Sequence, residues 1–159
     1  MSDLRPILLV DDDPRDVELT MIALGKHNLR NRVVNIHDGE QAIAYLLRTG
    51  EFASLEAPDP IVVLLDLKMP KVDGLEVLRA VRSHEQTCHL PVVILTSSSE
   101  ERDVVESYKL GVNAYVPKPV EFHAFVDAVS ELGAFWAILN EPPPPVETAR
   151  KGDLDERHA

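Results

Sequence analysis

Short apolar runs rich in β-branched residues alternate five times with amphipathic helical patterns, and this alternation most constrains the fold. Runs that are apolar throughout are typical of strands buried on both faces of a parallel sheet. Strands that alternate with helices favour βαβ units, and the sequence therefore predicts a doubly wound α/β domain. The expected strands are residues 6–10, 32–36, 61–65, 92–95 and 114–117, and the expected helices are residues 14–26, 39–48, 74–83, 99–110 and 120–138.

Four expected helices begin with an acceptor side chain followed three residues later by an acid or amide, which is the pattern of a capping box. The pairs are Asp13 with Asp16, Asp38 with Gln41, Asp73 with Glu76, and Ser98 with Glu101. Pro14 follows Asp13 at the first helical position, where its missing N–H costs nothing. We therefore interpret Asp13 as a helix cap rather than a metal ligand.

The last helical pattern continues beyond the part that a small sheet needs to cover. The apolar residues at its end are Phe135, Trp136, Ile138 and Leu139. Because an exposed aromatic patch generally marks an interface, we expect these residues to form a homodimer contact. Four prolines at 142–145 then stop the helix, and the polar residues after them are expected to be disordered. We therefore divide the chain into one domain, residues 1–140, and a proline-rich arm with a disordered tail, residues 141–159.

Charge and composition exclude several classes of function. Asp and Glu total 27 against 16 Lys and Arg, which gives a formal net charge of -11. This charge repels nucleic acids and anionic membranes, and no basic stripe offsets it. No apolar stretch is long enough to span a bilayer and no signal peptide is visible, so we expect a cytoplasmic protein. The single Cys88 excludes an internal disulfide and a cysteine-based zinc site, and we expect it to be partly buried.

Acidic residues and a lysine follow three of the predicted strands. Asp11 and Asp12 follow the first strand, Asp66 follows the third, and Lys118 follows the last. The carboxyl ends of parallel strands meet at one edge of a sheet, where open α/β folds build their sites. Neighbouring carboxylates raise one another's pKa values, and a divalent cation would keep them ionised. Magnesium accepts a few carboxylates and a backbone carbonyl, for which that of Lys68 is the candidate.

Two further features indicate an anion beside Asp66. Thr96 ends the fourth strand, and its hydroxyl can donate to an anion there, although a threonine at a strand end is more often a helix cap. Lys118 lies between Pro117 and Pro119 at the end of an apolar strand. A lysine in such a place is costly unless it pairs with a carboxylate or a phosphate.

These segments together resemble the receiver domain of bacterial two-component response regulators, over residues 5 to about 138. The matching segments are residues 10–14, 64–74, 95–97 and 114–119. The resemblance implies a flavodoxin-like receiver fold with a five-stranded sheet in the order 2-1-3-4-5 and five helices. It also implies a phosphoryl transfer from a sensor histidine kinase to Asp66. The implied Mg²⁺ ligands are Asp11, Asp12, Asp66 and the Lys68 carbonyl, the implied phosphoryl contacts are Thr96 and Lys118, and the implied switch residues are Thr96 and Tyr115.

A closer resemblance is to the small single-domain regulators that serve phytochrome-type histidine kinases. It rests on the long connection of residues 49–60 and on the aromatic and proline-rich ending at 135–143. Since no output domain is visible, we expect signalling by protein contact or by transfer to a downstream phosphotransfer protein. The chain would not be an enzyme beyond an intrinsic ability to phosphorylate and dephosphorylate itself.

Two other classes of protein remain as alternatives. A magnesium phosphatase of the haloacid-dehalogenase kind also uses an aspartate nucleophile, but it needs Asp-x-Asp-x-Thr or Val after the first strand, and Arg15 occupies the last of these positions. A receiver-fold adaptor that works without phosphorylation would be expected to have lost one of the site residues, and none is lost.

Overall fold

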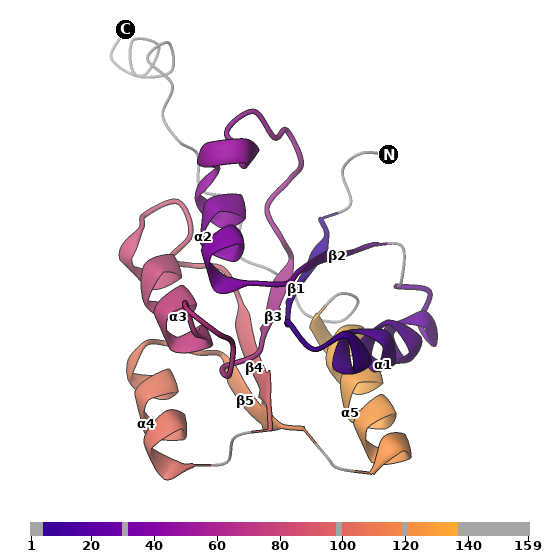
Figure 1. Ribbon diagram of the computed structural model, residues 1–159. Helices are drawn as coiled ribbons and strands as arrows, with labels where there is room; N and C mark the ends of the chain where they lie inside the picture. The colour runs from indigo at the N-terminus through magenta and orange to yellow at the C-terminus, as the bar shows by residue number, and fades with distance from the viewer. Residues whose placement is uncertain (1–4, 30–31, 98–99, 119–120, 137–159) are drawn as a thin grey trace, which may run out of the picture.

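The computed structural model of the 159-residue chain describes residues 5–29, 32–97, 100–118 and 121–136. Five parallel strands form one sheet in the order β2-β1-β3-β4-β5 (Figure 1), which confirms the predicted topology. The strands are β1 (Ile7–Val10), β2 (Val33–Ile36), β3 (Val62–Leu65), β4 (Val92–Thr96) and β5 (Ala114–Pro117). The helices are α1 (Pro14–Gly25), α2 (Gly39–Leu47), the 3₁₀ turn η2 (Gly50–Phe52), α3 (Gly74–Ser83), α4 (Glu101–Lys109) and α5 (Phe122–Ala134).

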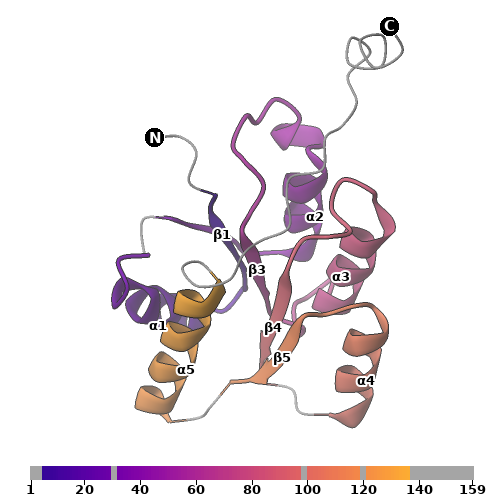
Figure 2. The same cartoon turned by 180° about the vertical axis from the view of Figure 1, so that it is seen from behind.

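Helices cover both faces of the sheet, with α1 and α5 on one side and α2, α3 and α4 on the other (Figures 1 and 2). Successive side chains of a strand point to opposite faces. In β1, Leu8 and Val10 join the core under α2 and α3, while Ile7 and Leu9 join the core under α1 and α5. All four are nearly inaccessible to solvent, as are the residues of β3. Burial on both faces explains why these strands are apolar throughout.

Three helices begin with the predicted capping residue. In one of them, α1, the cap accepts a different backbone N–H from the one predicted. The carboxylate of Asp38 accepts the N–H of Gln41 at 2.7 Å, and that of Asp73 accepts the N–H of Glu76 at 3.0 Å. Asp13 caps α1 by accepting the N–H of Arg15 at 2.9 Å, so its predicted role as a cap is confirmed.

The last two helices differ from the predicted ranges. Helix α4 begins at Glu101 with Glu100 in the capping position, so the predicted cap at Ser98 is wrong in position, and Ser98 itself lies outside the described residues. Helix α5 begins at Phe122 because Glu121 caps it, accepting two backbone N–H groups. The predicted burial of Cys88 is also wrong, since this residue is exposed.

Arg82, in the last turn of α3, forms hydrogen bonds at the edge of the sheet where β4 and β5 begin. Its guanidinium donates five hydrogen bonds of 2.8 to 3.1 Å, which uses all of its N–H groups. The acceptors are the carbonyl oxygens of Cys88, Leu90 and Gly111 and the side chain of Asn113. Arg82 therefore joins α3, the connection to β4, and the entry to β5.

Within the described residues, no helix is both long enough and apolar enough to cross a membrane.

Candidate functional site

Three acids meet at the edge where the strands end. Strands β1 and β3 are neighbours with Val10 opposite Leu65, so Asp11 and Asp66 leave the sheet side by side. The backbone N–H of Asp66 donates to Val10 at 3.0 Å, and that of Asp11 donates to Ile36 at 3.1 Å. These bonds continue the hydrogen-bond ladder of the sheet through both aspartates, and they fix the backbone positions from which the two side chains extend. The carboxylate oxygens of Asp11, Asp12 and Asp66 lie within 4.8 Å of one another.

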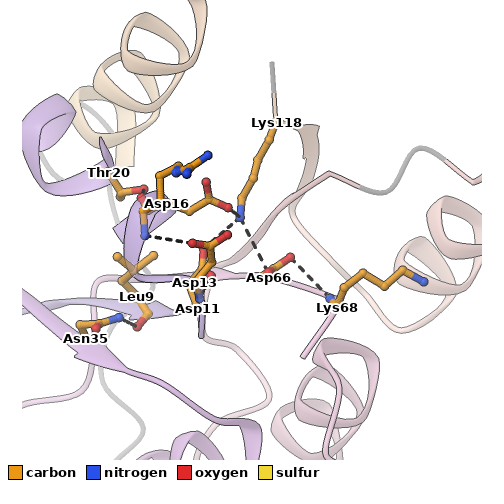
Figure 3. A network of polar contacts seen from close by, with 10 residues as sticks. Leu9, Asp11, Asp13, Asp16, Thr20, Asn35, Asp66, Lys68 and Lys118 are labelled. Atoms are coloured by element: carbon orange, nitrogen blue, oxygen red, sulfur yellow. Dashed lines mark hydrogen bonds and ion pairs between the residues drawn. The ribbon is translucent and has the colours of Figure 1, made fainter. Parts of the chain in front are cut away.

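Lys118 reaches the same place from the end of β5 (Figure 3). Its backbone N–H donates to the carbonyl of Thr96 at 2.6 Å, and its side chain is only 7% exposed. Its ammonium nitrogen lies 2.9 Å from Asp11, 2.8 Å from Asp16 and 3.7 Å from Asp66, each measured to an Oδ2 atom. The structure thus brings together Asp11, Asp12, Asp66 and Lys118, which come from three different strand ends.

Burial dominates the electrostatics of the acids. Loss of solvent raises the pKa of the Asp11 and Asp66 carboxyl groups, and the nearby Lys118 charge offsets this rise only in part. Neighbouring acids raise the two pKa values further, Asp66 acting on Asp11 and Asp12 acting on Asp66. One ammonium is therefore too little positive charge for this cluster of carboxylates.

The lysine itself is held in the charged state. Burial works to lower the pKa of Lys118, but the hydrogen bond to Asp16 and the charges of Asp11 and Asp66 outweigh burial and raise it. A protonated ammonium has three N–H donors and no acceptor. Asp11 and Asp16 account for two of these donors, so a third is available toward Asp66.

The donor set suits a small hard cation. Magnesium prefers oxygen ligands in octahedral geometry and keeps several waters, so three carboxylates can hold it without a closed cage. The Oδ1 atom of Asp11 accepts the N–H of Asp13 at 3.0 Å, yet each carboxylate oxygen has further lone pairs. The backbone N–H of Lys68 lies 3.4 Å from Oδ1 of Asp66, so this backbone borders the cluster. The role of the Lys68 carbonyl as a ligand stays a prediction.

Thr96 and Tyr115 occupy adjacent strands on one face of the sheet. Thr96 is fully buried, and its hydroxyl makes a hydrogen bond with Asp66 that helps to lower the pKa of that carboxyl. Tyr115 lies opposite Ile94, two residues before Thr96, and packs against the core under α2 and α3. Because side chains two residues apart share a face, Thr96 and Tyr115 point to the same side of the sheet.

Gly74, the first residue of α3, allows the helix to approach the backbone of the acid. A Cβ atom here would lie 2.3 Å from the Asp66 carbonyl oxygen and 2.7 Å from the Leu67 Cα. The N–H of Gly74 donates to the carbonyl of Leu67 at 3.0 Å. Only a glycine fits this contact, and the contact determines the path of the loop that follows Asp66.

Sequence reasoning missed two acids near the site. The sequence pattern predicts Asp16 only as a capping partner of Asp13, but its carboxylate is the nearest acid to the Lys118 ammonium. Asp103, whose side chain is 5% exposed, pairs with the Lys68 ammonium at 3.2 Å. The available signals were an acid in the first turn of the helix after the Asp11–Asp12 pair, and the four-residue spacing of Asp103 and Ser107 on the buried side of α4.

The predicted contact residues at the end of the chain fall into three groups. Phe135 is 48% exposed, as an interface residue would be. Trp136 instead packs against the core under α1 and α5, which leaves less of it for a partner. Ile138 and Leu139 lie outside the described residues.

Comparison with known proteins adds an independent line of support. Residues 7–130 match the family model for the response regulator receiver domain. The response regulator Rcp1 of Synechocystis sp. is 36% identical over 132 residues, which cover 83% of this chain and 88% of that protein.

Solved structures give the same result. The bacteriophytochrome response regulator RtBRR is 62% identical with a TM-score of 0.69, covering 89% of this chain and 85% of that one. The phosphorylated cyanobacterial phytochrome response regulator RcpA is 36% identical with a TM-score of 0.82, covering 88% and 99%. A manganese-bound form of Rcp1 is 34% identical with a TM-score of 0.81, covering 88% and 99%.

Proposed function

The chain belongs to the response regulator receiver domains and is related to phytochrome response regulators, and from this premise we propose that Asp66 accepts a phosphoryl group from a histidine kinase. The observation that carries the proposal is the convergence on Asp66 of a buried ammonium, Lys118, and a buried hydroxyl, Thr96. Both groups can donate to oxygens that carry charge on a transferred phosphoryl group.

The reaction requires little covalent machinery from the protein. A carboxylate oxygen of Asp66 forms a bond to phosphorus while the bond from phosphorus to the histidine nitrogen of the donor breaks, and the nitrogen keeps the electron pair. Charge on the three remaining phosphoryl oxygens must be neutralised as the group passes. Lys118 does part of this work, and Thr96 donates a hydrogen bond. When bound by Asp11, Asp12, Asp66 and the Lys68 carbonyl, Mg²⁺ supplies the remaining positive charge.

Manganese in a relative supports the choice of a divalent cation. Rcp1, which is 34% identical in its solved form, binds Mn²⁺. Both Mg²⁺ and Mn²⁺ suit carboxylate and carbonyl oxygens. The acids of this chain have the spacing and the excess negative charge that such an ion needs.

Phosphorylation would change the surface through Thr96 and Tyr115. The added group carries about -1.5 to -2 charges and three acceptor oxygens at neutral pH. Drawn toward these oxygens, the Thr96 hydroxyl vacates space on the face that Tyr115 shares with it. Tyr115 can then move inward, which alters the surface between β5 and α4.

We also propose the partners of this function. RtBRR and RcpA are phytochrome response regulators by name. By analogy with them, we propose that the kinase partner of this chain is a phytochrome-type histidine kinase. The phosphoryl group or the altered surface would then reach a downstream phosphotransfer protein or another contact partner. We place these events in the cytoplasm, and we expect self-phosphorylation and self-dephosphorylation as the only catalytic activities.

A second copy of the chain is the partner that we propose for the end of α5. Phe135 is exposed there and lines a groove together with Val116 of β5, Leu132 of α5 and His27, which follows α1. The sequence continues with Ile138 and Leu139, which would extend an apolar contact. Sedimentation should therefore detect a dimer at micromolar concentrations, and Phe135→Ser should shift it toward monomer. A wild-type chain that remains monomeric would contradict this part of the proposal.

Chemical phosphorylation tests the central step. Incubation with acetyl phosphate and Mg²⁺ should add the mass of one phosphoryl group, which alkaline hydroxylamine should remove. Asp66→Asn should abolish the labelling. Asp127→Asn, which changes an exposed acid on α5, should leave it intact. If the wild type takes up no phosphoryl group, the chain is an adaptor that works without phosphorylation.

Transfer from purified kinases tests the proposed partner. A phytochrome-type histidine kinase, phosphorylated on its histidine, should lose the label to this chain faster than a kinase of another sensor class does. Equal rates from both kinases would leave the acceptor role in place but contradict the phytochrome pairing.

A further inference from the structure

The Lys118 ammonium makes its shortest ion pair with an acid that the phosphoryl transfer does not use. Asp16 lies at 2.8 Å, against 2.9 Å for Asp11 and 3.7 Å for Asp66. Asp16 is absent from the group of acids that could share a cation. It belongs to α1, whereas the other acids follow β1 and β3. Figure 3 shows its carboxylate on the opposite side of the ammonium from Asp66.

We propose that Asp16 is a positioning residue, which holds the Lys118 ammonium in place when Asp11 is engaged by a divalent cation. The inference rests on the proposed function, because it concerns the same transfer to Asp66.

Asp16 is well placed to act as a fixed anchor. It lies in the first turn of α1, whose start is set by the cap at Asp13. The carbonyl of Asp16 accepts the hydroxyl of Thr20 at 2.7 Å, which ties the residue to the next turn. The Asp16 side chain is 26% exposed, compared with 3% for Asp11 and 9% for Asp66. Asp16 is therefore less enclosed by protein than the two buried acids.

This anchor is needed because Asp11 is shared between the Lys118 ammonium and the cation site. In the described structure Asp11 has an oxygen 2.9 Å from the ammonium and also belongs to the acid cluster. When Asp11 binds a divalent cation, part of its charge is withdrawn from Lys118, and the two positive charges repel each other. Asp16 does not share its charge with the cation. It can keep one N–H of the ammonium and leave another directed at Asp66.

The test compares Asp16→Asn with Glu18→Gln, a matched change at an exposed acid on the same helix. Labelling by acetyl phosphate in Mg²⁺ should slow about tenfold in Asp16→Asn, since small misplacements of a positioning group cost up to about 100-fold. Asp16→Glu should recover part of the rate. Glu18→Gln should label as the wild type does.

A second readout separates positioning from a general structural role. The ¹⁵N resonance of the Lys118 ammonium should change little when Mg²⁺ is added to the wild type, because Asp16 holds the group. In Asp16→Asn the same addition should shift the resonance strongly or broaden it. A loss of folding would instead change resonances throughout the protein.

The outcomes distinguish this inference from the proposed function. If the wild type labels, and Asp16→Asn labels equally fast with an unchanged response of the Lys118 resonance to Mg²⁺, the positioning role is overturned. If neither protein labels, the acceptor role of Asp66 fails, and the inference fails with it.

Discussion

Lys118 and Arg82 are buried or half-buried cations at opposite edges of one sheet, and they have different kinds of partners. Arg82 donates all five N–H groups to neutral oxygens, mostly backbone carbonyls. Lys118 faces the carboxylates of Asp11, Asp16 and Asp66, and the Asp12 carboxylate lies within 4.8 Å of those of Asp11 and Asp66. Burial lowers the pKa of Arg82, whereas the carboxylates raise the pKa of Lys118 despite its burial.

The difference separates a structural contact from a functional site. At Arg82 every donor has an acceptor and no acceptor carries a full charge, so the network gains nothing from a ligand. At Lys118 several carboxylates share one ammonium, and burial raises the pKa of Asp11 and Asp66. A bound cation would therefore stabilise the ionised form of this cluster. Perturbed pKa values at the carboxyl edge therefore indicate function.

Removal of Arg82 should give the largest loss of stability. Arg82→Ala removes five hydrogen bonds at once, each worth about 0.5–1.5 kcal/mol net, and we expect the free energy of unfolding to fall by about 4 kcal/mol. Urea unfolding measures the change, and Mg²⁺ should not reverse it. Arg82→Lys should recover little, because an ammonium cannot reproduce the planar fork. An unfolding midpoint like that of the wild type would show that Arg82 is not a structural clamp.

Removal of Lys118 should cost less, and Mg²⁺ should offset the loss. Lys118→Ala leaves the buried carboxylates without a counter-ion, and we expect a loss of about 3 kcal/mol in EDTA. Mg²⁺ should restore part of it, in contrast to Arg82→Ala. Lys26→Ala is the control, because the exposed pair of Lys26 with Asp127 contributes only about 0–1 kcal/mol. If Mg²⁺ has no greater effect on Lys118→Ala than on Arg82→Ala, the two edges do not differ as described.

A methyl group at Gly74 tests how closely the carboxyl edge is packed. Gly74→Ala places a Cβ against the Asp66 carbonyl, and we expect a loss of about 2 kcal/mol together with weaker Mg²⁺ binding. Gly25→Ala is the matched control, since a Cβ there meets no atom within 4 Å. That change should stabilise the protein by about 0.5–1 kcal/mol, because alanine favours helix. Equal effects at the two glycines would contradict the close approach of α3.

The pH dependence of stability should show the smallest effect. The raised pKa of Asp66 means that the folded protein binds this proton more tightly than the unfolded chain does. The resulting stabilisation is complete below the ordinary pKa of 3.8 and is lost as pH rises through the raised value. In EDTA the wild type should therefore lose stability relative to Asp66→Asn as pH rises, as urea unfolding at several pH values would show. Parallel curves for the two proteins would contradict the raised pKa.

The residue pattern alone was sufficient to predict five parallel strands and the convergence of Asp11, Asp66 and Lys118 at one edge of the sheet. The reason is physical, because doubly buried parallel strands leave an unbroken apolar run and their ends share one edge. The order of the strands came from the resemblance to receiver domains. It is confirmed by the pairing of β1 with β2 and β3, of β3 with β4, and of β4 with β5.

Partners that depend on side-chain direction could not be read from the sequence. Asp16 has the spacing of a capping partner, and only the folded structure shows that its carboxylate reaches Lys118 at the end of β5. The predicted start of α4 is wrong because the structure begins this helix at Glu101, after Glu100, whose side chain makes no capping hydrogen bond that a sequence pattern could signal. Trp136 has the periodicity of a core residue and the position of an interface residue, and in the structure it is partly buried against the core under α1 and α5.

Calorimetric titration with Mg²⁺ tests most directly whether the acids at the carboxyl edge form a cation site. Asp12→Asn removes a member of the acid cluster that has no ion pair with Lys118 among the described contacts. The control is Asp13→Asn, which changes the neighbouring acid but keeps a good helix cap. We expect one ion to bind to the wild type and to Asp13→Asn with equal affinity, and at least about tenfold more weakly to Asp12→Asn. Equal binding by Asp12→Asn, or an equal loss in Asp13→Asn, would contradict the account.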